Sequence, residues 1–495
     1  MSRVQASEQC DAVVVGSGPN GLAAAVVLAR AGLSVQVHEA QRTIGGGART
    51  LDLGLAPGIV HDICSAVHPM AAASPFFRAF DLAARGVQLN YPDVSYAQPL
   101  DGGRAGIAYR DLDDTVDGLG PDGPAWRRLM GPLARHSPAV VDVALFDRRS
   151  LPTDLLTAAQ FALSMLEQGT RLNGIRWKDE VAPALLMGVA AHSICRLPTL
   201  TAAGTALSLG ALAHSPGWPL PVGGSQAVID AMVADLEAHG GTVLTGAEVT
   251  SFDQLPKARA YLFDTTPRAL ARVLGDRLPA AYRRAFDRFR YGNAAAKVDF
   301  VLSGPVPWAH PEVGRAGTVH LGGTLAEMSY AEAEVAAGRH AERPMILASD
   351  PALFDPGRVV GGLRPFWSYT HVPAGSTVDV GDTVQAQIER FAPGFGDLVV
   401  ERHTIPAAKM ADHNANYVDG DIAAGAMSFW QLFKRPTLRW NPYATGVDGV
   451  YLCSGSTPPG PAVHGMCGLN AAQRALRARF GIRSLPSLAP SVDSD

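Results

Sequence analysis

Three glycines near the start of the chain have a spacing that suits the binding of a dinucleotide. Gly16, Gly18 and Gly21 form the pattern G-x-G-x-x-G. In such a loop the first glycine allows a sharp turn, the second lets a pyrophosphate approach the backbone, and the third lets a helix pack closely on a strand. Pro19 and Asn20 lie within the loop, and Pro19 suits a first helical turn, where its missing N–H leaves nothing unpaired. These five residues are our first candidates for cofactor binding.

The elements around this loop are those that a dinucleotide site requires. The β-branched run 12–15 predicts a buried strand, the breaker-free stretch 22–31 predicts a helix, and residues 35–39 predict a second strand. That strand ends in Glu39, about where a carboxylate would meet a ribose 2′-OH. A structural turn without a ligand is the alternative, but the order of strand, loop, helix, strand and acid favours the dinucleotide.

A second glycine cluster follows the predicted second strand. Gly46, Gly47 and Ala48 form a loop without bulky side chains, against whose backbone N–H groups a long cofactor can lie. Arg42 and Arg49 flank the loop and could neutralise phosphate. The alternative is a flexible surface loop with two solvated arginines.

Composition excludes several classes of protein. A chain of 495 residues is too long for one compact core, so we expect two domains. The formal net charge of −4 provides no basic field for nucleic acid. Five dispersed cysteines without a C-x-x-C pair, and a polar N-terminus without a signal core, indicate a reducing, cytoplasmic location. His61 and His68 lack a third ligand, so we expect no metal site.

The most apolar segment of the chain is 181–213. Two prolines, a histidine and an arginine interrupt it, so no run is long enough for a transmembrane helix. Two interpretations stay open: a helical core, or the lining of an apolar substrate tunnel that could also dip into a membrane surface. The location could thus be peripheral to a membrane, and a homodimer through a surface of low charge also stays open.

Two later segments return to the α/β pattern. Residues 227–238 predict a helix, and residues 242–252 and 258–264 predict strands. Near the C-terminus, residues 449–453 predict a strand, 454–466 form a loop rich in glycine and proline, and a helix is expected from about Cys467. A helix N-terminus at this point carries partial positive charge.

The order of these motifs resembles the phytoene desaturase-related FAD-dependent oxidoreductases. GSGPNG, Glu39, GGGART, PVGGSQAVIDAM, GDIAAGAMSFWQLFKRP and GSTPPGPAVHGMCGLNAA follow one another over nearly the whole chain. The start is similar to the FAD-binding start shared with amine oxidases, so the resemblance implies FAD with Glu39 on the adenosine ribose. Within the family the chain most resembles the branch of the pyridine nucleotide-disulfide oxidoreductase domain-containing protein 2 type, although it has no redox-active cysteine pair and no second dinucleotide motif for NAD(P)H.

The resemblance also implies the fold class and further cofactor contacts. The expected fold is α/β, with a Rossmann-type FAD-binding domain interleaved with an α+β substrate domain, as in amine oxidases and phytoene desaturases. The expected ranges are 1–75, 215–293 and 440–485 for the FAD domain, 76–214 and 294–439 for the substrate domain, and 486–495 for a flexible tail. Backbone groups of Val249 would meet the adenine, and Gly455, Val463, His464 and Met466 would lie at the flavin, whose N1–C2=O edge the last helix would face.

The function implied is a dehydrogenase or desaturase. A hydride would pass from an apolar, isoprenoid or polyene substrate to flavin N5, and oxygen or a quinone would reoxidise the flavin. Three alternatives stay open: an FAD-dependent amine oxidase, a redox-neutral polyene isomerase, and a flavin-binding scaffold without turnover. If a catalytic base is needed, His464 and then His371 are the candidates, because histidine titrates near neutral pH.

Overall fold

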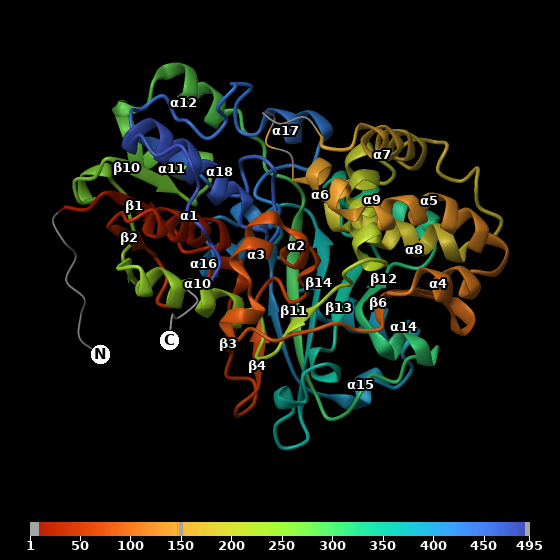
Figure 1. Cartoon of the computed structure of the whole chain (residues 1–495). Coiled ribbons are helices and arrows are strands. Elements are labelled where there is room, and N and C mark those ends of the chain that lie inside the picture. The colour runs from red at the N-terminus through yellow and green to blue at the C-terminus, as the bar shows by residue number, and fades with distance from the viewer. Residues whose placement is uncertain (1–8, 146, 148–151, 491–495) are drawn as a thin grey trace, which may run out of the picture.

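A five-stranded parallel sheet carries the first glycine loop (Figure 1). The computed structural model describes residues 9–145, 147 and 152–490. Strand β1 (Ala12–Val15) lies at the centre of this sheet and is buried throughout, as its β-branched run predicts. The strand order is β16-β10-β1-β2-β9, with β2 at Val35–His38, β9 at Thr242–Leu244, β10 at Ala260–Phe263 and β16 at Val450–Leu452. Three separate segments of the chain therefore build one sheet.

Helices cover both faces of the parallel sheet. On one face α1 (Pro19–Arg30) packs against α10 (Gln226–Ala238) and α18 (Met466–Ala475). On the other face lie α11 (Pro267–Leu274) and α12 (Ala280–Asp287). A Cβ on Gly468 would lie 1.9 Å from the carbonyl oxygen of Asn20, so α18 approaches α1 as closely as only a glycine permits.

A seven-stranded sheet forms the second half of the molecule. Its order is β15-β11-β14-β13-β12-β6-β7, and every neighbouring pair is antiparallel except β12 and β6. The strands span Val94–Leu100 (β6), Arg104–Tyr109 (β7), Ala294–Leu302 (β11), Ala316–Leu321 (β12), Ile346–Ser349 (β13), Arg364–Val372 (β14) and Val399–Ile405 (β15). In chain order, β6 and β7 come before β9 and β10 of the parallel sheet, and β11 to β15 come after them. The segments that build the two sheets therefore alternate along the chain.

The two faces of the seven-stranded sheet pack against different helices. Tyr96, Leu347, Trp367 and Tyr369 face a cluster built with α5 (Gly123–Arg135), α8 (Val181–Ala190) and α9 (Leu200–Ala213). The opposite face packs on α14 (Gly381–Phe391) and α15 (Phe395–Leu398).

The remaining α-helices and strands complete the molecule. They are α2 (Pro69–Ala73), α3 (Pro75–Phe80), α4 (Leu112–Gly118), α6 (Ser137–Ala144), α7 (Leu155–Gln168), α13 (Leu325–Ala336), α16 (Met410–His413), α17 (Phe429–Lys434), β3 (Thr50–Asp52), β4 (Val60–Asp62), β5 (Leu89–Asn90) and β8 (Leu220–Pro221). No helix among the residues that the structure describes has the length and apolar character needed to cross a bilayer.

The predicted α/β class is confirmed, and the elements differ from expectation in two places. The strand expected over 242–252 ends at Leu244, because the chain turns away from β2 after three paired residues. The tail expected to be flexible is bound over 487–489: Arg30 donates to the carbonyl oxygens of Ser487 and Ala489, and Leu488 is only 7% exposed. Residues 491–495 lie outside the described part of the chain, and the domain boundaries stay a prediction.

Candidate functional site

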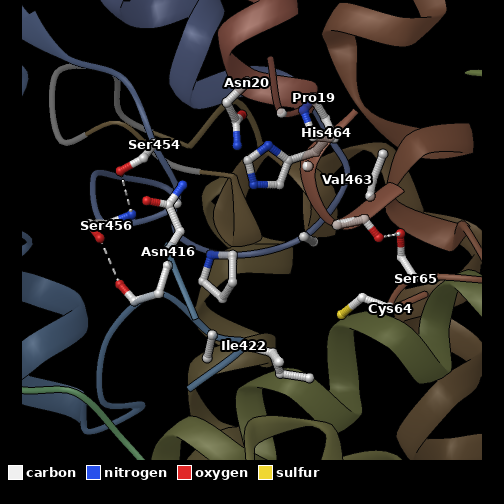
Figure 2. Close-up of a pocket in the computed structure, with 18 of the residues that line it drawn as sticks. Pro19, Asn20, Cys64, Ser65, Asn416, Ile422, Ser454, Ser456, Val463 and His464 are labelled. Atoms are coloured by element: carbon white, nitrogen blue, oxygen red, sulfur yellow. Dashed lines mark hydrogen bonds between the residues drawn. The ribbon is translucent and has the colours of Figure 1, made fainter. Parts of the chain in front are cut away.

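A cavity of about 1060 Å³ runs between residues of the two sheets. We call one part the polar arm; its lining residues fall within 15–20, 38–41, 46–48, 247–250 and 264–273. We call the other part the apolar arm; its lining residues fall within 143–145, 158–165, 192–209 and 422–433, together with Trp218, Thr318, Leu347, Trp367 and Tyr369. Segments 64–70, 413–417 and 454–464 lie between the arms. Figure 2 shows Asn20, His464, Cys64 and Ile422 around the opening.

The first glycine loop is shaped by close contacts with Asp264. A Cβ on Gly18 would lie 2.5 Å from Asp264 Oδ2, and a Cβ on Gly21 would lie 2.2 Å from the carbonyl oxygen of Gly16. The N–H of Gly21 donates to Asp264 Oδ2 at 2.9 Å. Gly21 therefore serves packing and does not line the cavity, whereas Gly16, Gly18, Pro19 and Asn20 do.

Asp264 is a site residue that the sequence analysis missed. It follows β10, the neighbour of β1, and lines the polar arm. Burial raises the pKa of its carboxyl to about 7; the nearby charge of Glu39 adds to the rise, and the hydrogen bond from Gly21 opposes it. The sequence did contain a signal for this residue, since Asp264 directly follows a predicted strand and ligands bind at the carboxyl ends of parallel strands.

Glu39 lines the polar arm directly after β2, and Ser17 ties it to both glycine loops. The carboxylate of Glu39 accepts from the N–H of Ser17 at 2.9 Å, from Ser17 Oγ at 2.6 Å and from the N–H of Gln41 at 2.8 Å. Ser17 Oγ in turn accepts from the N–H of Gly45 at 3.1 Å. Ser17, an x residue of the motif, was not predicted as a site residue.

The two arginines beside the second glycine cluster have different environments. Arg49 is buried and donates to the carbonyl oxygen of Gly46 and to Thr43 Oγ1, both at 2.8 Å, and to the carbonyl oxygen of His413. Arg42 is exposed, and neither arginine lines the cavity. The loop they flank does line it, through Gly46, Gly47 and Ala48. Arg49 thus holds the shape of the loop.

The C-terminal loop reaches the cavity through Gly455, Val463 and His464. The N–H of Met466 donates to His464 Nδ1 at 3.0 Å, so Nε2 carries the proton and donates to the carbonyl oxygen of Gly460 at 3.1 Å. Burial lowers the pKa of His464 to about 4. Both ring nitrogens are engaged by backbone and the ring is neutral, so the geometry does not fit the predicted role of a base. Met466 starts α18 outside the lining.

The other candidate base, His371, lies outside the cavity lining. It sits on β14, fully buried, with Nδ1 2.5 Å from Oε1 of Glu332. Its neighbours on the same strand face, Trp367 and Tyr369, do line the apolar arm. Trp367, Tyr369 and His371 alternate along this strand, but only the first two line the cavity.

Uncharged side chains line the apolar arm wherever the structure describes its wall. The charged residues among the described part of the cavity wall are Glu39, Glu248, Asp264 and Arg272, and all four belong to the polar arm. The apolar segment 181–213 was expected to form either a helical core or the lining of a substrate tunnel, and it does both. Helix α8 is buried core, whereas α9 lines the arm with residues such as Leu200 and Leu209. Helices α7 and α17 add Phe161, Met165 and Leu432.

The polar arm fits an elongated dinucleotide cofactor. Its wall consists of two glycine loops, and a Cβ on Gly46 would lie 3.0 Å from the Cα of Gly18. Asn20 Oδ1 is buried there and has no hydrogen-bond partner among the residues that the structure describes. Val249 lines the same arm, where an adenine would lie if Glu39 bound the ribose. Among the described residues no cluster of His, Cys, Asp or Glu could hold a metal ion.

Comparisons with known proteins agree with this geometry. The family model described as flavin containing amine oxidoreductase matches residues 20–278. The pyridine nucleotide-disulfide oxidoreductase domain-containing protein 2 of Rattus norvegicus is 25% identical over 94% of this chain and 93% of its own length. A subunit of the limonene dehydrogenase of Castellaniella defragrans is 31% identical over 23% of this chain and 20% of its own length. The structure of cyclohexylamine oxidase from Brevibacterium oxydans shares the fold, with a TM-score of 0.57, 15% identity and coverage of 95% of this chain and 99% of that one.

Proposed function

The chain belongs to the flavin-containing amine oxidoreductase family, and from this premise we propose that it removes a hydride from an apolar, uncharged substrate, as a dehydrogenase or desaturase. It is an FAD-dependent oxidoreductase. FAD supplies the two-electron acceptor for such a reaction. Oxygen or a quinone would reoxidise it.

The absence of charge from the apolar arm carries this proposal. Its described lining residues include no Asp, Glu, Lys or Arg. Burial lowers the pKa of His192 in this arm to about 3, and that of His68 and His413, which lie between the arms, to about 4. A buried ammonium or carboxylate without a partner is costly, whereas apolar surface gains free energy on entering such a chamber. The arm therefore suits a terpenoid or polyene better than an amine.

The chain's own residues would position the reactants. The glycine loops, Asn20 and Glu39 would bind the nucleotide half of FAD, and the loop of His464 would lie at its flavin half. The side chains of α7, α9 and α17 would exclude water and align the reacting C–H bond. Such a hydride transfer needs orientation more than a strong base, which agrees with the neutral state of His464.

Amine oxidation is the second candidate, and one observation favours it. Trp367 and Tyr369 line the apolar arm with ring centroids 5.3 Å apart and planes at 88°. Aromatic faces attract cations, so this pair could hold an ammonium group without a carboxylate.

Anaerobic titration of the FAD-loaded enzyme separates these functions. We expect polyene and terpenoid substrates to bleach the flavin absorption, whereas amines of similar length leave it unchanged; added oxygen or quinone should then restore the colour. Bleaching by amines alone would establish amine oxidation. A polyene that is isomerised without bleaching would establish redox-neutral isomerisation, and a flavin unchanged by every compound would favour the scaffold.

A further inference from the structure

One face of the seven-stranded sheet carries an unusual number of buried polar groups. This face is covered by α8 and α9, and most of its neighbours are apolar. Several of its buried side-chain atoms have no hydrogen-bond partner among the described residues: Tyr96 Oη, Gln98 Oε1, Thr318 Oγ1 and His320 Nδ1. Each such atom costs free energy unless a water or a ligand satisfies it, so their concentration on one face calls for a partner.

Three side chains connect this face with the cavity. Thr318, on β12, is 2% exposed and lines the apolar arm, and Tyr369 lines it from β14. His192, which follows α8, also lines it, with its Nε2 only 2.8 Å from Nε2 of His320. Thr318 and His320 are two residues apart on β12 and therefore share a face of the sheet.

The histidine pair can present either a donor or an acceptor. Because the two Nε2 atoms face each other, one of them must carry the bridging proton. If His320 donates, His192 Nδ1 is protonated and can donate to a ligand. If His192 donates, its Nδ1 is a free acceptor. Thr318 Oγ1 can likewise donate or accept.

We propose that His192 and Thr318, on the wall that Tyr369 also lines, form a subsite for the hydroxyl or carbonyl oxygen of an otherwise apolar substrate. This rests on the proposed function in that the apolar arm is taken as the substrate chamber. An uncharged oxygen satisfies Thr318 and His192 in either proton arrangement. A carboxylate or ammonium would enter a wall without an opposite charge, and a pure hydrocarbon would leave Thr318 Oγ1 unpaired.

Matched eight-carbon probes test this subsite in the FAD-loaded enzyme. Displacement of Nile red by octane, 1-octanol, octylamine and octanoate gives their affinities without turnover. Thr318→Val removes only the hydroxyl at nearly constant volume, and that hydroxyl has no hydrogen-bond partner in the described part of the chain. We expect at least a tenfold loss of 1-octanol affinity and an unchanged octane affinity.

Thr370→Val is the control, since Thr370 lies on β14, on the sheet face opposite to its neighbour Tyr369, and donates to the carbonyl oxygen of Met345. It should change neither affinity. Equal losses for octane and 1-octanol, no loss for either, or tighter binding of octylamine or octanoate than of 1-octanol would each overturn the subsite. Flavin bleaching is a separate measurement from Nile red displacement. Bleaching by amines alone would refute the proposed function and would leave the result on the subsite unchanged.

A second and independent observation concerns the outer surfaces of α7 and α17. Helix α7 exposes Leu155, Leu156 and Leu163, and α17 exposes Phe429 and Trp430; Leu156 is 80% and Trp430 69% exposed. The same helices also line the apolar arm, Phe429 among their lining residues, and both helices lie along the upper edge of the molecule in Figure 1. Exposed apolar surface is thus continuous with the cavity wall.

The charge beside α17 is positive. Residues 422–447 contain Lys434, Arg435 and Arg439 and no Asp or Glu. Lys434 and Arg439 are exposed, and Lys434 Nζ lies 5.7 Å from the ring centroid of Trp430. Tryptophan and leucine flanked by basic side chains are typical of helices that lie in a membrane interface.

We infer that α7 and α17 dock on an anionic lipid bilayer, from which an apolar substrate can enter the cavity directly. Co-sedimentation of the FAD-loaded enzyme with phosphatidylcholine vesicles, with and without phosphatidylglycerol, tests this. We expect binding that rises with the anionic lipid and falls at least tenfold in the Leu156→Ser, Trp430→Ser double variant, whose sites lie outside the cavity lining.

Tyr330→Ser is the control, because Tyr330 is 66% exposed but lies on α13. It should bind vesicles as the wild type does. Absence of vesicle binding, undiminished binding of the double variant, or a dimer that the double variant abolishes would overturn the lipid assignment.

Discussion

In the polar arm the wall of the cavity is mainly backbone, whereas in the apolar arm it is side chain. Short loops after β1 and β2 make the polar arm, and a Cβ on Gly18 would collide with Asp264 at 2.5 Å. The apolar arm is made mainly by α7, α9, α17 and one sheet face, drawn from residues 143–433. Backbone walls demand particular residues at particular spacings, whereas side-chain walls demand only size and polarity. A short sequence motif therefore predicts the cofactor, whereas no such motif predicts the substrate.

The most severe test of this difference is Gly18→Val. The added side chain would meet Asp264 Oδ2 and also fill the space expected for the pyrophosphate, so we expect purified protein without bound FAD. The flavin content of the folded protein, read from its absorption spectrum and circular dichroism, measures this. Gly118→Ala is the control, because nothing lies within 4 Å of a Cβ there. A Gly18→Val protein with full flavin content would show that the loop does not approach the cofactor.

The same difference explains which site residues could be predicted. Gly16, Gly18 and Glu39 were found because they follow one another within a short, ordered motif, and the structure places all three on the cavity wall. Asp264 was missed because its partner Gly21 is 243 residues away along the chain. No local pattern records a contact between strands that become neighbours only in the folded sheet.

The fold was predictable for a related reason. Strand β1 and helix α1 are specified by local runs, and the glycines at their junction specify how they pack. By contrast, the location of His464 at the cavity was predictable but its chemistry was not, because the hydrogen bond from Met466 to its ring depends on the turn before α18. Residue type alone suggested a base, and the backbone geometry argues against one.

Arg49 and Arg42 form a matched pair that sharpens the comparison. Arg49→Ala removes a buried guanidinium that holds the second glycine loop, so we expect at least a tenfold loss of FAD affinity, or about 1.4 kcal/mol. Arg42→Ala removes an exposed side chain outside the cavity lining and should leave the affinity within a factor of about two. Reconstitution of the FAD-free variants, followed by flavin fluorescence, measures both. A larger loss in Arg42→Ala would place the phosphate contact there instead.

His464→Ala should keep FAD and lower turnover about tenfold, or about 1.4 kcal/mol. The ring shapes the loop between the arms and holds the start of α18, so its loss misaligns the flavin half of the cofactor without removing a proton acceptor. Because burial lowers its pKa to about 4, His464 should contribute no ionisation near neutral pH. The pH profile of kcat/KM in the variant should therefore match that of the wild type. Loss of a limb near pH 6 to 7 in the variant would restore the histidine as a base.

The smallest effect is expected from Asp264→Asn, and its sign depends on pH. Burial raises the pKa of Asp264 to about 7, well above the value of 3.8 expected in the unfolded chain, so the folded state favours the neutral acid. Its contribution to stability is fully present below about pH 4 and is lost as the pH rises to about 7, because ionisation is easier in the unfolded chain.

Asparagine keeps an acceptor for the N–H of Gly21 and cannot ionise. The FAD-free variant should therefore gain a few degrees in Tm over the wild type at pH 8 and little at pH 4. Thermal unfolding of both proteins across this range measures the difference. If the gain were the same at every pH, Asp264 would be charged in the folded protein, and the polar arm would hold two carboxylates, Asp264 and Glu39, where the phosphates of FAD must approach. The backbone N–H groups of the glycine loops would then have to bind the cofactor against that repulsion. Binding in the polar arm would depend on backbone groups even more than on side chains.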